Sequence, residues 1–269
     1  DSSAAGLGAD GPLATLGAVL AQGLVEAAER PVRFVNVSTV GARSADLESQ
    51  VTRALILKPH IAVILIGGND VTQLTRPQTA VRDLGQAVAR LVDSGSEVVV
   101  GTCPDLGSVK PIREPLRTVA RRLSRQLAAA QTIAVVEAGG RSVSLGSLLG
   151  PEFSEFPEEM FAHDQFHPSS RGYAMAAQAI LPSVLDSLGL LPPDERVPDE
   201  RLGDALLPVS IAAVSAADAG GTEVAGGRVS GEERGPRGRW AQLRHRISKP
   251  VPKAEKPAPL TADMPDEEY

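Results

Sequence analysis

Short runs of aliphatic and β-branched residues alternate with longer amphipathic stretches over the first 190 residues of the chain. Four of these runs have the length of a strand and predict strands over residues 32–40, 61–66, 97–101 and 132–137. The run IAVILI at 61–66 has no polar residue, which is typical of a parallel strand that is buried on both faces. The amphipathic stretches have apolar residues at i, i+3 and i+4 and predict helices over residues 13–30, 44–57, 77–94, 115–130 and 170–188.

This alternation of strands and helices indicates the fold class. It predicts an α/β domain over residues 1–190, with three α/β/α layers around a mostly parallel, flavodoxin-like sheet. Residues suited to helix ends support these bounds: Ser44 is expected to cap the second helix, Ser169 or Ser170 to cap the last one, and Gly189 to end it. The segment that begins at Asp1 would normally follow a central strand. We therefore expect the first strand to be missing from this chain, together with an upstream part that was removed.

Residues 191–269 differ in composition from the first part of the chain. Pro, Gly, Ala and charged residues dominate, and the stretch at 199–218 predicts at most one weak helix. Residues 234–256 carry eight basic residues against the single acid Glu255. This composition predicts a disordered tail that acts as a solvated linker. A weak contact of the basic stretch with an anionic membrane surface, with Trp240 and Leu243 inserted, is the second interpretation.

Bulk properties exclude several classes of function. The net charge of −6 does not favour nucleic-acid binding. The single cysteine, Cys103, excludes an internal disulfide and a site with several cysteine ligands, and we expect it to be a buried structural thiol. Ala, Gly and Arg are frequent and Lys is rare, as in GC-rich bacterial genomes such as those of actinobacteria. No apolar run approaches the length of about 18 residues that a transmembrane helix needs.

Three segments with candidate chemistry follow strands or begin helices. Ser2 lies just before a helix, where open α/β sheets bind ligands, although a serine-rich turn is the simpler interpretation. Gly41 follows the run at 32–40 and could offer its N–H to a ligand, or only form a tight turn. Asn69 follows Gly67 and Gly68 at the end of the most hydrophobic run, where its amide could donate to an oxyanion or belong to a simple turn.

A fourth segment pairs a carboxylate with a histidine. Asp164 lies three residues before His167, so one turn can bring its carboxylate to one ring nitrogen and leave the other nitrogen to accept a serine proton. His163 and His60 lack such a carboxylate placement. A metal site of His163, Asp164 and His167 would lack a further clustered ligand.

Taken together and in this order, the four segments resemble the consensus blocks of the SGNH (GDSL-type) hydrolase family. The resemblance covers residues 1–190 and implies Ser2 as nucleophile, His167 as general base and Asp164 as its partner. It implies an oxyanion hole made of the N–H of Ser2, the N–H of Gly41 and the amide of Asn69, with no metal or organic cofactor. The glycine that precedes Asp-Ser in the family is absent here, and Ser3 is a rival nucleophile.

The resemblance implies a serine esterase that acts on small or short-acyl carboxylic esters. A deacetylase of a sugar or cell-envelope glycan, a lysophospholipase or thioesterase, and a catalytically silent binding module are the alternatives. The partners expected are therefore a small-molecule, lipid or glycan ester and no nucleic acid, and an exported or cell-envelope location is favoured. An aromatic-rich cluster could line an acyl site or simply pack over the sheet end: Phe153, Phe156, Met160, Phe161 and Phe166.

Overall fold

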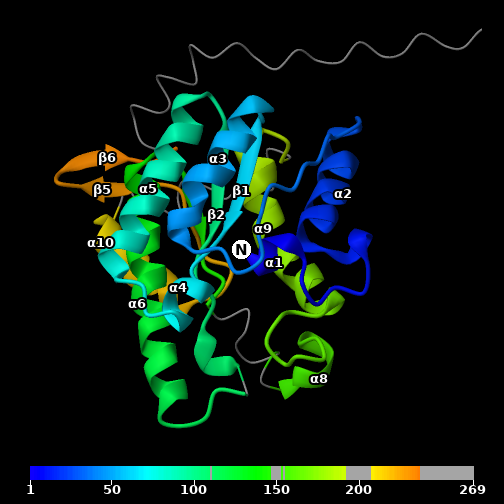
Figure 1. Cartoon of the computed structure of the whole chain (residues 1–269). Helices are drawn as coiled ribbons and strands as arrows, with labels where there is room; N and C mark the ends of the chain where they lie inside the picture. Colours follow the sequence, from blue (N-terminus) through cyan, green and yellow to red (C-terminus); the bar gives the residue numbers. More distant parts are fainter. Residues whose placement is uncertain (110, 147–152, 154, 192–206, 237–269) are drawn as a thin grey trace, which may run out of the picture.

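The computed structural model describes residues 1–109, 111–146, 153, 155–191 and 207–236 (Figure 1). The helices of these residues are α1 (Ser2–Ala5), α2 (Leu16–Ala28), α3 (Leu47–Ile56), α4 (Gly68–Thr72), α5 (Pro77–Asp93), α6 (Leu116–Glu137), α8 (Pro157–Met160), α9 (Ser170–Ser187) and α10 (Val209–Asp218). The 3₁₀ turns are η1 (Pro12–Ala14), η2 (Ser44–Asp46) and η3 (Leu106–Ser108). The strands are β1 (Ile61–Leu65), β2 (Glu97–Gly101), β3 (Arg141–Val143), β4 (Glu223–Val224), β5 (Gly227–Val229) and β6 (Glu232–Arg234).

Four strands form the main sheet, in the order β1-β2-β3-β4. The first three are parallel, with Ile61 opposite Glu97 and Val99 opposite Arg141. Strand β4 is antiparallel to β3, and β5 and β6 form a separate hairpin. The mostly parallel sheet predicted from the sequence is therefore confirmed.

The two faces of the sheet are covered by different helices, because successive side chains of a strand point to opposite faces. Ile64, Val98 and Val100 pack in a core cluster with residues of α3, α5 and α6. Leu65 and Val99 pack in a second cluster with residues of α2 and α9. These layers are visible in Figure 1 and confirm the predicted three-layer α/β/α architecture. None of the described helices combines the length and the apolar character that a membrane span requires.

Two of the predicted strands are wrong. Residues 132–137 belong to α6, because their apolar side chains continue its buried stripe: the buried positions are Leu127, Ala128, Gln131, Thr132, Val135 and Val136. The strand that follows is the short β3, which the sequence pattern did not predict. Residues 32–40 are largely exposed and form no strand, because no strand of the described residues lies alongside them.

The predicted helices from the other amphipathic stretches are confirmed as α2, α3, α5, α6 and α9. Ser169 caps α9 by accepting from the N–H of Gly172, and Gly189 follows the helix with a φ of +68°. The capping role predicted for Ser44 is wrong, because its backbone N–H and hydroxyl both donate to the buried carboxylate of Asp70.

The disordered tail predicted over residues 191–269 is wrong for residues 207–236. Helix α10 packs against α6, and Val209, Ala216 and Val224 share a core cluster with Val136 of α6. Strand β4 then extends the main sheet beside β3. Small and β-branched residues in short elements form this layer, so the segment has no long hydrophobic run that would distinguish it from a linker. The basic stretch with Trp240 and Leu243 lies outside the described residues.

Candidate active site

Ser2 lies at the carboxyl end of β1. The backbone nitrogen of Asp1 donates to the carbonyl oxygen of Leu65 at 3.2 Å, which ties the start of α1 to the end of the strand. The Asp1 carboxylate caps α1 by accepting from the N–H groups of Ser3 and Ala4. Ser2 is therefore the first residue of the helix, and its N–H has no acceptor among the described residues. That N–H is available to a bound group.

Asp164 and His167 form a compact turn before α9. One carboxylate oxygen of Asp164 accepts from the backbone N–H groups of Phe166 (3.0 Å) and His167 (2.9 Å). The other oxygen lies 2.5 Å from Nδ1 of His167. Partial burial alone would raise the pKa of Asp164, but these hydrogen bonds outweigh it and lower that pKa below its ordinary value. The carboxylate is therefore anionic at neutral pH and fixes the orientation of the imidazole ring.

The second ring nitrogen of His167 reaches Ser2. Its Nε2 atom lies 3.1 Å from Oγ of Ser2, across 165 positions of sequence. With the proton of the ring held on Nδ1 by Asp164, Nε2 can accept the hydroxyl proton of Ser2. The structure thus places Asp164, His167 and Ser2 in one hydrogen-bonded chain. The contact of His167 is with Ser2 and not with Ser3, although Ser3 also borders the adjoining cavity.

The close approach of the serine and histidine segments depends on residues that the sequence analysis did not single out. Gly8 has a φ of +97°, and a Cβ atom there would lie 2.6 Å from the carbonyl oxygen of Pro168 and 3.1 Å from Cβ of His167. The buried hydroxyl of Tyr173, on α9, donates to the carbonyl oxygen of Leu7 at 2.7 Å. Burial raises the pKa of Tyr173, so this hydroxyl keeps its proton. The loop after Ser2 therefore lies close to the turn of His167 at Gly8 and is bound to α9 at Leu7.

Asn69 also borders the cavity that Ser2 and His167 line. Its side-chain nitrogen donates to the carbonyl oxygen of Ala42 at 3.0 Å, which uses one of its two N–H bonds. The other N–H remains to be offered to a ligand. Gly41 lies next to Ala42 with a φ of +79°, and it is exposed and is not one of the residues that line the cavity. The hydrogen bond from Asn69 to Ala42 links the loop that carries Gly41 to a residue that lines the cavity.

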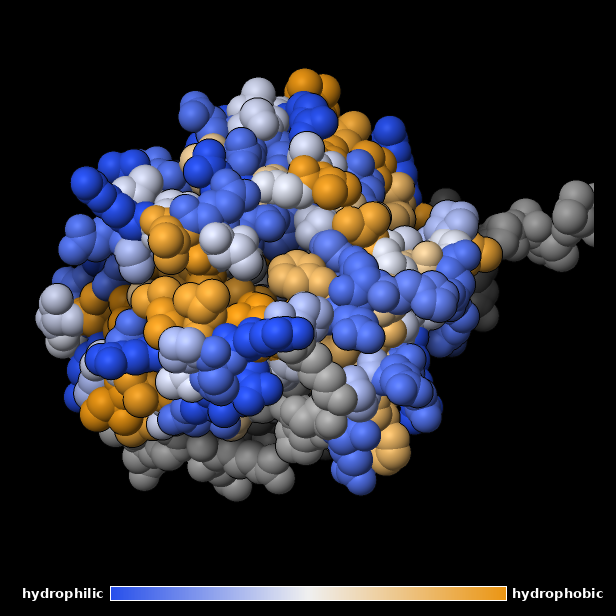
Figure 2. All heavy atoms as spheres, turned by 60° about the horizontal axis from the view of Figure 1, so that its bottom comes forward, coloured by the Kyte–Doolittle hydropathy of each residue, from blue (hydrophilic) through white to orange (hydrophobic). Residues whose placement is uncertain are grey.

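A cavity that is open to solvent adjoins these groups. Its walls are mainly apolar and come from two core clusters. Residues packed with α2 and α9 form one part: Leu16, Leu65, Leu145, Tyr173 and Ala176. Residues packed with η3 and α6 form the other: Leu106, Val109, Phe153 and Phe166. Figure 2 brings the lower side of Figure 1 forward and shows apolar side chains gathered in the middle of this face, with polar ones around them.

The aromatic-rich cluster of the sequence analysis divides between these two environments. Phe153 and Phe166 line the cavity, whereas Met160 and Phe161 are buried behind it and Phe156 is exposed. Phe153 and Phe161 contact each other edge to face, with ring centroids 5.0 Å apart. Packing and cavity lining are therefore both present in this cluster. Residues 110, 147–152 and 154, which are next in sequence to Val109 and Phe153, lie outside the described residues.

Cys103 is buried, as predicted for a structural thiol, and burial raises its pKa so that the thiol stays protonated. Its backbone N–H donates to the side chain of Gln131 at 2.7 Å, and Gln131 donates to the carbonyl oxygen of Ile66 at 3.1 Å. Gln131 thus joins the carboxyl ends of β1 and β2, a role that nothing in the sequence pattern indicated. Among the described residues, no group of three or more His, Cys, Asp or Glu side chains is arranged to hold a metal ion.

Comparison with known proteins shows the family of the chain. The model of the GDSL-like Lipase/Acylhydrolase family matches residues 1–175. A GDSL-like esterase of Mycobacterium tuberculosis is 41% identical over 190 residues, which are 70% of this chain and 60% of that protein. The chain therefore spans about 60% of the length of this relative.

Two solved structures share the fold. A lipase from a goat rumen metagenome matches with a TM-score of 0.55 and 14% identity, over 66% of this chain and 91% of that one. TesA matches with a TM-score of 0.52 and 23% identity, over 71% of this chain and 96% of that one. At these identities the two likenesses support the fold alone.

Proposed function

The chain belongs to the GDSL-like lipase/acylhydrolase family, the SGNH hydrolases that its four segments resemble, and from this membership we propose that it is a serine esterase. The observation that carries the proposal is the hydrogen-bonded chain from Asp164 through His167 to the hydroxyl of Ser2. A nucleophile, a base and a group that orients the base are the parts that acyl transfer needs.

The proposed reaction begins when Nε2 of His167 removes the hydroxyl proton of Ser2. Oγ of Ser2 attacks the carbonyl carbon of the ester, and His167 then returns the proton to the oxygen of the departing alcohol. An acyl-enzyme remains on Ser2. Water loses a proton to His167 and attacks this acyl group, which leaves as the acid while Ser2 regains its proton. Asp164 stabilises the imidazolium that forms in both halves.

We propose three donors for the oxyanion: the N–H of Ser2, the N–H of Gly41 and the second N–H of the Asn69 amide. Ser2 and Asn69 both line the same cavity. Removal of one donor from an oxyanion hole typically costs about 10²–10³ in rate. Asn69→Ala is therefore expected to lower kcat strongly and to lower it less than Ser2→Ala does.

The walls of the cavity favour an apolar acyl group as the part of the substrate that enters it. Aliphatic and aromatic side chains dominate next to Ser2, and burial of a methylene group against such walls contributes about 0.8 kcal/mol. A small or short-acyl ester is our first candidate. A glycan deacetylase would need polar groups that recognise a sugar, and a longer acyl chain would indicate lysophospholipase or thioesterase activity.

Hydrolysis of p-nitrophenyl esters from acetate to palmitate tests the proposal, with the wild-type protein, Ser2→Ala and the matched control Ser3→Ala. Ester hydrolysis that Ser2→Ala abolishes and Ser3→Ala retains is expected, with an optimum at short chains. Equal loss in both serine variants would contradict the assignment of Ser2. An absence of hydrolysis on every ester, and on acetylated sugars, would instead favour a catalytically silent binding module.

A further inference from the structure

A second carboxylate, that of Asp70, is buried beside the proposed active site and takes no part in the reaction described above. Asp70 is 1% exposed, and one of its oxygens accepts from the backbone N–H of Ser44 (3.0 Å) and from its hydroxyl (2.9 Å). Ser44 is itself fully buried. Desolvation of a buried carboxyl group is costly, and burial raises the pKa of Asp70 although the bonds from Ser44 oppose this. A residue that only filled space here would more favourably be apolar.

The contact fixes the end of the loop that carries Gly41. Within this loop the N–H of Ala42 donates to the carbonyl oxygen of Thr39 at 3.2 Å. The N–H of Arg43 donates to the carboxylate of Asp46 at 2.7 Å. The N–H of Ser44 donates to Asp70. The N–H groups of Ala42, Arg43 and Ser44 are therefore all bonded, whereas that of Gly41 has no acceptor among the described residues.

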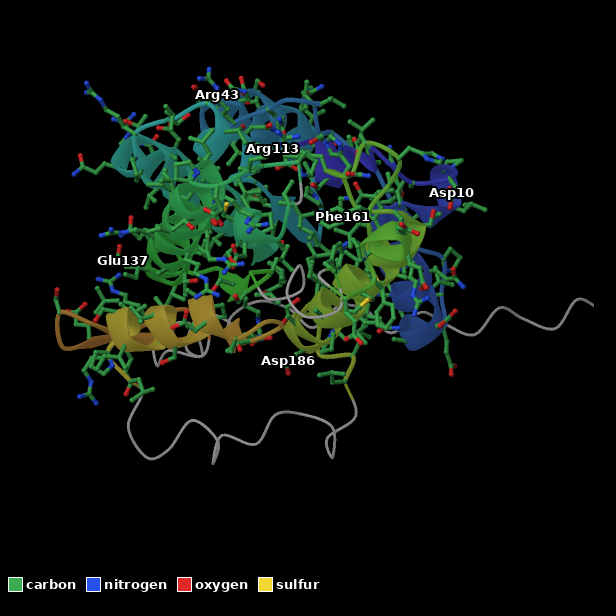
Figure 3. The ribbon with its side chains drawn as sticks, turned by 90° about the horizontal axis from the view of Figure 1, so that it is seen from below. Asp10, Arg43, Arg113, Glu137, Phe161 and Asp186 are labelled. Atoms are coloured by element: carbon green, nitrogen blue, oxygen red, sulfur yellow. The ribbon has the colours of Figure 1, made fainter. Side chains whose placement is uncertain are left out.

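Helix α4, which carries Asp70, contacts the loop at a second point. Asn69 precedes Asp70 on α4 and donates to the carbonyl oxygen of Ala42. Two neighbouring side chains of α4 therefore bind the loop at Ala42 and at Ser44, on either side of Arg43. In Figure 3, which views this face from below, Arg43 lies toward the edge of the molecule and Phe161 nearer to its middle. The loop is thus an outer segment that α4 contacts at two points.

We propose that Asp70 is a positioning residue for the oxyanion hole. Through Ser44 it holds the Gly41 loop against α4, so that the N–H of Gly41 and the amide of Asn69 keep a fixed relative position. The inference rests on the proposed esterase function. It assigns Asp70 no contact with substrate, and its effect passes through the loop.

Four variants test the inference: Asp70→Ala, Asp70→Asn, Ser44→Ala and, as a matched control, Ser96→Ala. Ser96 is a buried serine whose hydroxyl donates to the carbonyl oxygen of Pro59 at 2.7 Å, beside the amino ends of β1 and β2 and away from Ser2. Asp70→Asn retains an oxygen that can accept both bonds from Ser44. Ser44→Ala removes one of the two bonds without changing Asp70.

We expect kcat to fall by about 10²-fold in Asp70→Ala, since a misplacement of about 1 Å in a catalytic group can have that effect. Ser44→Ala is expected to show a smaller fall, and Asp70→Asn and Ser96→Ala a kcat close to wild type. KM should change little in all four. Reaction of Ser2 with a p-nitrophenyl phosphonate, whose anionic oxygen occupies the oxyanion hole, should slow in the same order.

The outcomes are distinguishable from a failure of the proposed function. A wild-type protein without Ser2-dependent hydrolysis would overturn the proposed function, and the inference with it. A wild-type kcat in folded Asp70→Ala and Ser44→Ala would overturn the inference alone. The inference would also be overturned if Ser96→Ala lowered kcat as much as Asp70→Ala and Ser44→Ala do at an equal loss of Tm. If Asp70→Ala does not fold, the comparison of Ser44→Ala with Ser96→Ala decides.

Discussion

Asp164 holds His167 at two points, through the backbone N–H at 2.9 Å and through Nδ1 of the ring at 2.5 Å. The carboxylate therefore fixes both the turn and the orientation of the imidazole. The two contacts involve the two oxygens of one carboxylate, so a change at Asp164 alters both together. This arrangement has a consequence for pH dependence.

The lowered pKa of Asp164 predicts that its carboxyl group stays ionised at pH values below about 3.9, the ordinary pKa of Asp. Because the pKa is depressed in the folded state, the stabilisation is present above the unfolded value and is lost as the pH falls through the folded value. A carbon-13 NMR titration of the Asp164 carboxyl group should give a midpoint below that of an unstructured peptide. In denaturant unfolding, the stability difference between wild type and Asp164→Asn should be constant near neutral pH and shrink only in acid. A difference that shrinks already between about pH 7 and pH 5 would contradict the assignment.

The packing of Gly8 predicts an effect on both stability and activity. Gly8→Ala would place a methyl group against the carbonyl oxygen of Pro168 in a backbone conformation with positive φ. We expect a loss of about 1–3 kcal/mol in the free energy of unfolding, together with a lower kcat because the turn of His167 must shift. Gly11→Ala is the matched control, since its backbone is extended and nothing lies within 4 Å of a Cβ there. Equal stability and kcat in the two variants would show that the contact is not needed.

The parts of the candidate site that could be predicted share one property: the residue type itself carries the chemistry. Ser2, Asn69 and the pair Asp164 and His167 are polar residues next to strand or helix ends, and their order along the chain resembles a known family. The contacts of Asp70 and Gln131 could not be predicted. They join segments that are distant in sequence, and a buried Asp or Gln leaves no periodic pattern.

The fold shows the same division. Strand β1 is an uninterrupted apolar run and β2 continues as one after Glu97, and a local pattern predicts such runs well. Residues 132–137 have the β-branched character of a strand, but the buried stripe of a long helix overrides that local preference. Strands β3 and β4 have three and two residues, too few for any periodicity to show.

A further prediction concerns Gln131, which joins the carboxyl ends of β1 and β2. It accepts from the N–H of Cys103 and donates to the carbonyl oxygen of Ile66, so Gln131→Leu would leave two buried backbone groups without partners. Each such group costs about 1–3 kcal/mol, and thermal unfolding should show a correspondingly large fall in Tm. Gln22→Leu is the control, because that side chain is on an exposed helix surface, where it donates to Glu26. If Gln131→Leu were no less stable than this control, the brace between the two strand ends would have no energetic role.

The last prediction concerns Arg141 and the segment at 207–236, whose strand β4 extends the sheet. Its guanidinium is largely buried and pairs with Asp186 of α9 (2.5 Å) and Glu223 of β4 (3.2 Å). Arg141→Leu would leave two carboxylates in a poorly solvated position without this cation, and removal of one partner from a buried ion pair typically costs about 3–5 kcal/mol. Since both carboxylates keep some solvent contact, we expect the lower end of that range in urea unfolding. Arg82→Leu breaks an exposed pair with Asp83 and should cost well under about 1 kcal/mol.

The ion pairs of Arg141 are with Asp186 and Glu223 and not with the residues around Ser2. The kcat per folded molecule should therefore be unchanged in Arg141→Leu, at a temperature where this variant and Arg82→Leu are both folded. A fall in kcat without a loss of stability would mean that the segment at 207–236 acts on the site and does not merely stabilise the sheet.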